Sequence, residues 1–286
     1  MKKSNDEMTE VVVPLWLFQK KFGSQKRKTK MKKLVILFTL ILFIISCGEK
    51  VREEILERYD NGKKKDIIYF TGRNNNIKIV KQIFYYENGQ IEIKANFKDG
   101  KQDGKLTSYH ENGQIKNEGN FKDGIQNRQG KWTYYNEDGS IRKEEMYKNG
   151  KENGKWVEYH ENGQIWNEVN FKDGKQDGKL TSYHENGWLK QEGTFKDGKQ
   201  DGKSIFYNED GSIRKEEMYK NGKENGKWVE YHKNRQIKQE GNFKEGKEEG
   251  KWVEYHENGQ KQYEGTFKDG NLISKKRWNE DGSVKE

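Results

Sequence analysis

Glycine recurs every 24 residues through most of this chain, and that spacing limits the fold more than any other feature. Each glycine precedes Lys and a short apolar or aromatic run, at Gly130, Gly154, Gly178, Gly202, Gly226 and Gly250. The copies barely differ: GKWVEYHENGQIWNEVNFKDGKQD at 154–177 is followed by GKLTSYHENGWLKQEGTFKDGKQD at 178–201. A fixed period of this size predicts an array in which each unit packs only against its neighbours. Such arrays usually display a surface rather than enclose an active site.

The composition agrees with an ordered but thin structure. Charged residues make up 36% of the chain and hydrophobic residues 30%, a polarity that often accompanies disorder. However, 13% of the residues are aromatic, and the apolar residues fall at fixed places in the repeat. The net charge of +9 comes mostly from residues 1–46, and the remaining chain is nearly balanced. Because the repeats interleave both signs and offer no basic patch, we expect no nucleic-acid partner.

Each unit reads as two strands joined by a tight turn. In the unit 154–177 the strands are 156–160 and 165–171, and Asn162-Gly163 lies between them. Asn-Gly and Asp-Gly between strand patterns are strong hairpin signals. A second turn at 172–174 leads to the next unit, and proline, which would interrupt a sheet, is absent after Pro14. Eight such units are expected at 80–103, 104–129, 130–153, 154–177, 178–201, 202–225, 226–249 and 250–273.

Two features of the strands predict how the units pack. A three-residue Glu-Asn-Gly loop would place Tyr159 opposite Ile165 and bring Val169 and Phe171 onto the face of Tyr159, whereas a two-residue loop would separate these apolar sets. We favour the longer loop. Glycine also recurs two residues before Phe, where we expect an aromatic ring of a neighbour over the bare backbone; these positions are Gly119, Gly193, Gly241 and Gly265. One turn departs from the pattern, with Arg235 after Asn234.

These residues resemble MORN repeats of the bacterial variant form. The resemblance rests on Gly-Lys-Trp, Tyr, the nearly constant Asn-Gly and the Phe/Tyr-Lys-Asp/Asn-Gly run, and it covers about 80–273. It implies an all-β fold, an elongated antiparallel β-hairpin array in a single twisted sheet over 80–286. Proteins of this kind often carry the name YwqK-family antitoxin.

A separate targeting segment precedes the array. Residues 31–47 read MKKLVILFTLILFIISC, with Lys32 and Lys33 before the apolar stretch 34–45. This stretch suits a signal peptide at 31–46 and is shorter than the roughly 20 residues of a membrane-spanning helix. Residues 1–30 fit such a signal poorly, and we interpret them as an upstream extension from a mis-set start. Residues 47–79 are expected to form a tether, mostly Glu49–Arg58, and a degenerate first unit.

The end of this segment resembles the lipobox of bacterial lipoproteins. Ile44-Ile45-Ser46-Cys47 precedes Gly48, and Cys47 is the only cysteine. The resemblance implies cleavage between Ser46 and Cys47 and attachment of lipid to Cys47. A lipid with two or three acyl chains would anchor the chain stably. We therefore expect a membrane-bound protein of the cell envelope, in the outer membrane if the host has one. The alternative is an uncleaved anchor that ends in a free cysteine.

Two side-chain columns are candidate binding sites. All five histidines occupy one slot, at His110, His160, His184, His232 and His256. Equivalent residues of adjacent hairpins lie roughly 9–10 Å apart, too far to share a zinc ion, so we expect a polar residue before the turn and no metal. A second slot holds Trp132, Trp156, Trp228 and Trp252. Packing within the sheet is the simpler interpretation, and an exposed strip for a protein or glycan is the functional one.

Catalytic signals are absent from the repeats. Gly198–Ser204 imitates a phosphate loop, but three residues separate its glycines where four are required. The Asp-Gly turns lack the spacing of a calcium loop. We therefore expect no enzyme, no cofactor and no metal. The sequence favours a lipid-anchored scaffold for an unknown protein partner, with a YwqK-type antitoxin and a cell-wall glycan binder as alternatives.

Overall fold

The computed structural model describes residues 50–73 and 76–285, and these form one antiparallel sheet of 22 strands. No helix occurs within the described residues, and none of their elements is a helix able to cross a membrane. The all-β hairpin array predicted from the sequence is thus confirmed. The extension 1–30, the signal peptide 31–46, the cleavage residue Ser46 and Cys47 lie outside the described residues.

The strands follow one another along the chain. They are β1 (Arg52–Arg58), β2 (Lys64–Thr71), β3 (Lys78–Tyr85), β4 (Ile91–Lys98), β5 (Lys101–Tyr109), β6 (Ile115–Phe121), β7 (Arg128–Tyr135), β8 (Ile141–Lys148), β9 (Lys151–Glu152), β10 (Gly154–Tyr159), β11 (Ile165–Lys172), β12 (Lys175–Tyr183), β13 (Leu189–Lys196), β14 (Lys199–Gln200), β15 (Gly202–Tyr207), β16 (Ile213–Lys220), β17 (Lys223–Tyr231), β18 (Ile237–Lys244), β19 (Lys247–Glu248), β20 (Gly250–Tyr255), β21 (Lys261–Lys268) and β22 (Asn271–Arg277).

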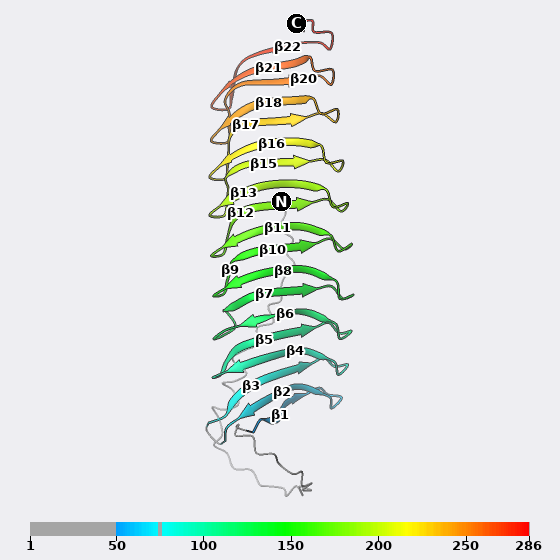
Figure 1. Ribbon diagram of the computed structural model, residues 1–286, viewed down its shortest axis with the longest axis vertical. Helices are drawn as coiled ribbons and strands as arrows, with labels where there is room; N and C mark the ends of the chain where they lie inside the picture. Colours follow the sequence, from blue (N-terminus) through cyan, green and yellow to red (C-terminus); the bar gives the residue numbers. More distant parts are fainter. Residues whose placement is uncertain (1–49, 74–75, 286) are drawn as a thin grey trace, which may run out of the picture. The chain divides into compact units, whose positions relative to one another are not determined.

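The long strands that follow one another along the chain pair antiparallel, so the sheet is a continuous meander (Figure 1). Three short strands, β9, β14 and β19, pair with β8, β13 and β18, respectively. After a break of one residue, β10, β15 and β20 pair with these same three strands. Each such pair is therefore one interrupted strand. Because all contacts are between neighbours in sequence, the array repeats the same interface along its length.

The sheet begins earlier than the sequence predicted. The segment expected to be a tether, Glu49–Arg58, contains strand β1, which pairs with β2 from Arg52 opposite Phe70 to Arg58 opposite Lys64. The tether prediction is therefore wrong for Arg52–Arg58. The strand gave little signal because its two apolar residues, Ile55 and Leu56, are adjacent and do not alternate with the charged residues around them.

The Asn-Gly turns have the predicted length. Tyr159 is opposite Ile165, and the amide of His160 donates to the carbonyl of Gln164 at 2.8 Å. The Asn162 side chain accepts from the Gln164 amide at 2.9 Å, and Gly163 has a φ of 82°. Glycine is needed here because other residues rarely adopt this backbone. We call the side of the sheet that carries these turns the turn edge.

A β-bulge directly after each turn changes the face of the sheet on which the following side chains lie. Part of the predicted arrangement is therefore wrong. Glu158 is opposite Asn167 while Tyr159 is opposite Ile165, so Trp166 is an extra residue. The same skip occurs in the other seven hairpins, at Glu92, Lys116, Arg142, Lys190, Arg214, Lys238 and Gln262. One extra residue reverses the alternation. Val169 and Phe171 therefore lie on the face of Trp156, opposite Tyr159, and the predicted union of the two apolar sets is wrong beyond Ile165.

A second irregularity explains the glycine period. Asn167 to Val169 pair with Ser182 to Leu180, but Phe171 pairs with Gln176, so residues near Gly178 are left over. Gly154, Gly178, Gly202 and Gly226 have φ values of 113°, 111°, 107° and 116°. This backbone region is nearly closed to residues with a side chain. The repeated glycine thus marks the bulge at which each hairpin passes into the next.

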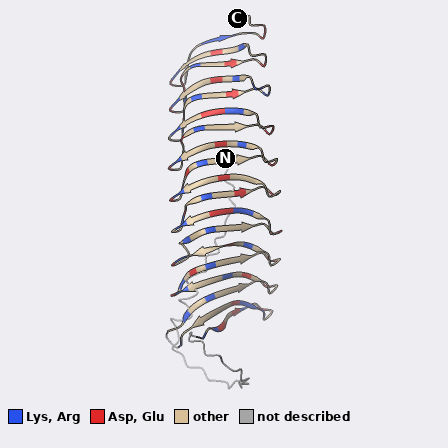
Figure 2. Cartoon of the chain, viewed as in Figure 1, with Lys and Arg blue, Asp and Glu red and all other residues tan. Residues whose placement is uncertain are grey.

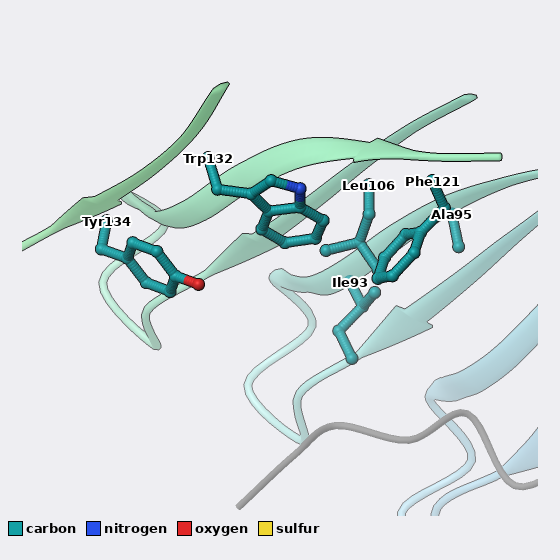
Figure 3. Packing of buried hydrophobic residues seen from close by; sticks show 6 residues of the cluster. All are labelled: Ile93, Ala95, Leu106, Phe121, Trp132 and Tyr134. Carbon is teal, nitrogen blue, oxygen red and sulfur yellow. The ribbon is translucent and has the colours of Figure 1, made fainter. Parts of the chain in front are cut away.

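The apolar core lies where the aromatic columns of successive hairpins meet. Its best-buried cluster comprises Ile93, Ala95, Leu106, Phe121, Trp132 and Tyr134, drawn from strands β4 to β7 (Figure 3). The rings of Phe121 and Trp132 meet edge to face with centroids 4.9 Å apart. Since a single sheet has no second layer, neighbouring hairpins provide the burial.

Candidate interaction surface

The four tryptophans of the predicted strip lie on one face of the sheet, which we call the aromatic face. Trp132 and Trp252 are 2% and 3% exposed, whereas Trp156 and Trp228 are half-buried. Their rings contact aromatic residues: Trp156 lies 4.5 Å from Phe171, and Trp252 lies 5.1 Å from Phe243. The indole N–H of Trp132 donates to the carbonyl of Asn120 at 3.3 Å. The described sheet therefore buries half of this strip.

Glycine makes room for two of these rings. A Cβ on Gly119 would lie 2.2 Å from the ring of Trp132, and one on Gly241 would lie 2.2 Å from the ring of Trp252. The predicted ring over glycine is confirmed at these two positions. At Gly193 the neighbour is the hydroxyl of Ser204, so the prediction is wrong there. At Gly265 the nearby rings come from its own strand.

Two glutamates are buried on the aromatic face, and sequence reasoning missed both. Glu145 and Glu217 are each 2% exposed. Glu145 pairs with Lys143 at 2.6 Å and accepts from the hydroxyl of Tyr147 at 2.9 Å. Glu217 repeats this arrangement with Lys215 and Tyr219, and also accepts from the indole of Trp228 at 3.2 Å.

Burial raises the pKa of Tyr147 and Tyr219 above the usual tyrosine value, and the neighbouring Glu145 and Glu217 add to that rise. Every polar partner in these two clusters is a residue of the sheet itself. Lys143, Glu145 and Tyr147 lie on one strand, and in the second cluster Trp228 is the partner that comes from a neighbouring strand.

The opposite face carries a regular ladder of ion pairs. In seven hairpins a lysine of the first strand meets a glutamate of the second: Lys105–Glu118, Lys131–Glu144, Lys155–Glu168, Lys179–Glu192, Lys203–Glu216, Lys227–Glu240 and Lys251–Glu264. Both signs are therefore interspersed over the whole sheet (Figure 2). Ion pairs as exposed as these each contribute about 0–1 kcal/mol to the free energy of unfolding.

Tyrosines of the following hairpin extend this ladder. Tyr207 donates to Glu192 at 2.8 Å, and Tyr255 donates to Glu240 at 3.1 Å. Burial and the hydrogen bond to Glu192 raise the pKa of Tyr207 to about 12. The same bond, with the help of Lys179, holds the pKa of Glu192 below its usual value.

The histidine column joins neighbouring hairpins at the turn edge. Each Nε2 lies 2.9–3.3 Å from a backbone carbonyl of the next hairpin: His110 from Tyr135, His160 from Tyr183, His184 from Tyr207, His232 from Tyr255 and His256 from Trp278. Since a carbonyl only accepts, the ring donates. The residues that the structure describes hold no group of three or more His, Cys, Asp or Glu side chains suited to a metal ion.

The far edge of the sheet carries the Asp-Gly turns. Asp173 and Gly174 have φ values of 50° and 85°, and the amide of Gly174 donates to the carbonyl of Glu152 at 2.9 Å. The phosphate-loop imitation around Gly198 is one of these turns, and its Gly198 amide donates to Gln176. A shallow hollow between two of the turns is lined by lysines and aspartates, with no aromatic ring but Phe195.

Among the tryptophans of residues 50–285, the exposed ones are two that lie outside the predicted strip. Trp166 and Trp188 are 45% and 56% exposed, and both lie at the turn edge, in adjacent hairpins. Sequence reasoning followed the recurring slots and so passed over residues that occur once. Their signal was present as departures from the repeat, because Trp166 stands where other units have Lys, Arg, Glu or Gln, and Trp188 where others have Gln or Ser.

The comparisons with known proteins agree with this architecture. The family model described as "MORN repeat variant" matches seven stretches of the chain, residues 80–99, 102–123, 128–149, 152–173, 176–197, 200–221 and 248–269. The hairpin that contains Asn234-Arg235 falls between the last two matches. No curated protein matches the chain.

Solved structures show only weak likeness. The crystal structure of TcdB2-TccC3-Cdc42 is 12% identical over 81% of this chain and 15% of that chain, with a TM-score of 0.18. A protein of unknown function from Bacteroides fragilis NCTC 9343 is 8% identical over 60% of this chain and 94% of that chain, with a TM-score of 0.13. At TM-scores this far below 0.5, neither likeness bears on function.

Proposed function

Because this chain belongs to the MORN repeat variant family, we propose that its sheet is a protein-interaction scaffold held at a bacterial membrane by lipid on Cys47. The observation that carries the scaffold role is the repetition of one surface. The same ion pairs recur in seven hairpins from Lys105 to Glu264, with the same turns between their strands. A surface of this kind offers a partner many equivalent contacts, as other repeat proteins do.

The anchor rests on the amino-terminal sequence. An apolar stretch at 34–45 leads to Ser46 and the single cysteine, Cys47. Diacylglycerol attached to this thiol, with acylation of the new amine after cleavage, would hold the array at the cell envelope. The first described strand starts at Arg52, so the lipid would lie only a few residues from the sheet.

The alternatives receive less support. The antitoxin role rests on the name that many members of the family carry, and no contact in the described sheet favours it. Glycan binding through the tryptophan strip is disfavoured because Trp132 and Trp252 are buried. An adjacent toxin gene would favour the antitoxin, and saturable glycan retention that Trp→Ala variants lose would favour the wall binder.

Labelling with radioactive palmitate tests the anchor directly. We expect wild-type protein to be labelled and to sediment with membranes, and the Cys47→Ala variant to be unlabelled and released. Unlabelled, soluble wild-type protein would overturn the anchoring proposal. Photocrosslinkers placed at exposed Lys179 and at Trp188 then test the scaffold role. Discrete crosslinked proteins support it, and the absence of any crosslink in intact cells contradicts it.

A further inference from the structure

Four departures from the repeat gather at the turn edge between residues 166 and 235. Trp166 and Trp188 replace a cation and a glutamine, Lys233 replaces the glutamate of Glu161 or Glu257, and Arg235 replaces glycine. Each change puts an indole or a positive charge where the other units are polar, acidic or bare. They fall in three of four successive hairpins, which confines them to one part of one edge.

The two indoles are positioned by neighbouring side chains. The ring of Trp166 lies 6.3 Å from the ring of His160, whose Nε2 is bonded to the next hairpin. The ring of Trp188 covers Gly211 so closely that a Cβ there would lie 2.4 Å from it. Both indoles are therefore partly supported and still largely exposed. Tryptophan in such a setting is the residue type most enriched at binding hot spots.

Two hairpins further on, the local structure around Arg235 exposes its cationic side chain. Arg235 has a φ of 70°, and its charge helps to hold the pKa of Asp210 below the usual value, after the hydrogen bonds from Ser212. In most hairpins a glutamine covers the glycine of the next turn, as Gln236 covers Gly259. Ser212 is too short to do so, which leaves room for the side chain of Arg235.

The charge of this turn differs from that of its counterparts. Residues 232–238 contain Lys233, Arg235 and Lys238 and no carboxylate, whereas 160–166 and 256–262 each contain a glutamate. Lys238 pairs with Glu230 at 3.1 Å. Lys233 has no ion-pair partner among the described residues, unlike the seven lysines of the opposite face. The turn thus carries cations and no carboxylate of its own, two hairpins from Trp188, and Arg235 acts on Asp210 of the intervening turn.

We propose that Trp166, Trp188, Lys233 and Arg235 form a docking site, the edge patch, for an extended protein segment that carries an apolar residue followed or preceded by acidic ones. This inference rests on the proposed scaffold function and names the chemistry of its partner. The turns of Trp188 and Arg235 are four strand spacings apart, about 19 Å, which an extended chain covers in about six residues. The apolar residue packs on the indoles, and the carboxylates reach Lys233 and Arg235.

A synthetic peptide of that design is the probe. It carries Leu-Phe, five Ser and Thr residues, then Glu-Glu-Asp, with a fluorescein label, and a second peptide has Gln-Gln-Asn in place of the acids. Binding to the full chain in detergent micelles is followed by fluorescence anisotropy. We expect the acidic peptide to bind at least about tenfold more tightly than the neutral one, and to weaken as salt is raised.

Restoring the repeat residues gives variants that keep the fold. Trp166→Lys with Trp188→Gln removes the indoles, and Lys233→Glu with Arg235→Gly removes the cations. Each pair should weaken binding at least about tenfold. One control is Lys148→Glu with Lys172→Gln, which lowers the net charge by the same three units at the Asp-Gly edge. The other is Trp156→Leu, which reproduces Leu180. Both controls should bind as wild type does.

Three outcomes overturn the edge patch: no binding of the acidic peptide, equal binding of the neutral peptide, or equal loss in the Lys148 and Lys172 control. Retention of wall glycan fragments that Trp188→Gln abolishes, without peptide binding, would assign the indoles to a glycan instead. The scaffold proposal is tested separately, by the crosslinks in cells. If crosslinks form in cells while the peptide does not bind, the array is still a scaffold and only the chemistry assigned to its partner is wrong.

Discussion

At the scale of single residues, glycine and its neighbours come in matched pairs across the hairpin interface. Gly119 faces Trp132 and Gly241 faces Trp252, whereas Ala95 faces Leu106 and Val169 faces Leu180. In these pairs the side chains complement each other in size, as close packing requires, whereas Glu217 is opposite Trp228 and Gly193 has Ser204 as its neighbour. The sequence already hinted at this, because glycine recurs two residues before Phe. It could not show that Ser204 would replace the ring at Gly193.

Gly119→Ala tests this matching. The added methyl group would collide with the ring of Trp132, so we expect a loss of about 1–3 kcal/mol in the free energy of unfolding. In a Trp132→Leu background the same change should cost much less, because it recreates the pair of Ala95 and Leu106. Denaturant unfolding of the four proteins measures the difference. An equal cost in both backgrounds would show that the ring is not the obstacle.

Arg235 is a second test at this scale. A side chain at a φ of 70° costs roughly 1 kcal/mol relative to glycine. We therefore expect Arg235→Gly to stabilise its hairpin by about that amount, and Gly163→Arg to destabilise the hairpin 154–177 by a similar one. Hydrogen exchange of the amides of His232 and Gln236 reads the hairpin locally. Slower exchange after Arg235→Gly is expected, and faster exchange would contradict the strain.

At the scale of the element, the turn could be predicted and the bulge could not. Asn162-Gly163 carries its backbone conformation in its residue types, and the pairing of Tyr159 with Ile165 followed from it. The extra residue, Trp166, occupies a slot held elsewhere by Lys, Arg, Glu or Gln, none of which marks a bulge. For that reason the sequence did not predict correctly the face of the sheet on which Val169 and Phe171 lie. Equally, only the coordinates reveal that Glu145 and Glu217 are buried.

The contact between hairpins at Tyr207 predicts a response to alkaline pH. Tyrosine in an unfolded chain ionises near pH 10, and in the folded array burial and Glu192 raise the pKa of Tyr207 to about 12. The folded state holds this proton more tightly than the unfolded chain does. The stabilisation of the fold by the protonated Tyr207 hydroxyl is therefore complete below about pH 10 and is lost as pH rises to about 12.

The absorbance of tyrosinate, titrated in wild type and in Tyr207→Phe, isolates this group. We expect the difference titration to have its midpoint near pH 12, and the pKa of Glu192 to rise in the variant because a hydrogen bond to its carboxylate is lost. A midpoint at the value of free tyrosine would mean that the hydroxyl is not bound to Glu192 in solution.

At the scale of the whole molecule, each hairpin meets its neighbours through the same contacts, so whole units should be removable. Deleting 202–225 joins Asp201 to Gly226 and brings Gly193 against Trp228, as Gly119 meets Trp132. The background needs Arg235→Gly, because Trp188 would then cover residue 235. We expect a folded sheet with unfolding nearly as cooperative as in the parent chain.

Deleting 178–201 is the matched control. It places Val169 beside Ser204 in place of Leu180, and the resulting void should cost about 2 kcal/mol more than the first deletion. Deleting 202–213, half a unit, should unfold the neighbouring hairpins because it reverses the strand direction. Circular dichroism and the midpoints of denaturant unfolding rank the three deletion variants by stability. If the half-unit deletion were as stable as the whole one, the hairpin would not be the unit of the fold.

The hydrogen bonds along the two edges run in opposite directions. At the turn edge His160 and Asn162 donate to the following hairpin, while at the other edge Gly174 donates to the preceding one. Hairpins with His and Asn in these slots therefore offer the same donors and acceptors to both neighbours, whereas Asn136 and Asn208 donate to Ser140 and Ser212 of their own turns. An in-frame duplication of one unit in the gene would insert a hairpin that is complementary to its surroundings from the first generation. The length of such an array is then a heritable trait that recombination can increase or decrease, and a compensating mutation is needed only where the new neighbours do not match, as with Trp188 and Arg235.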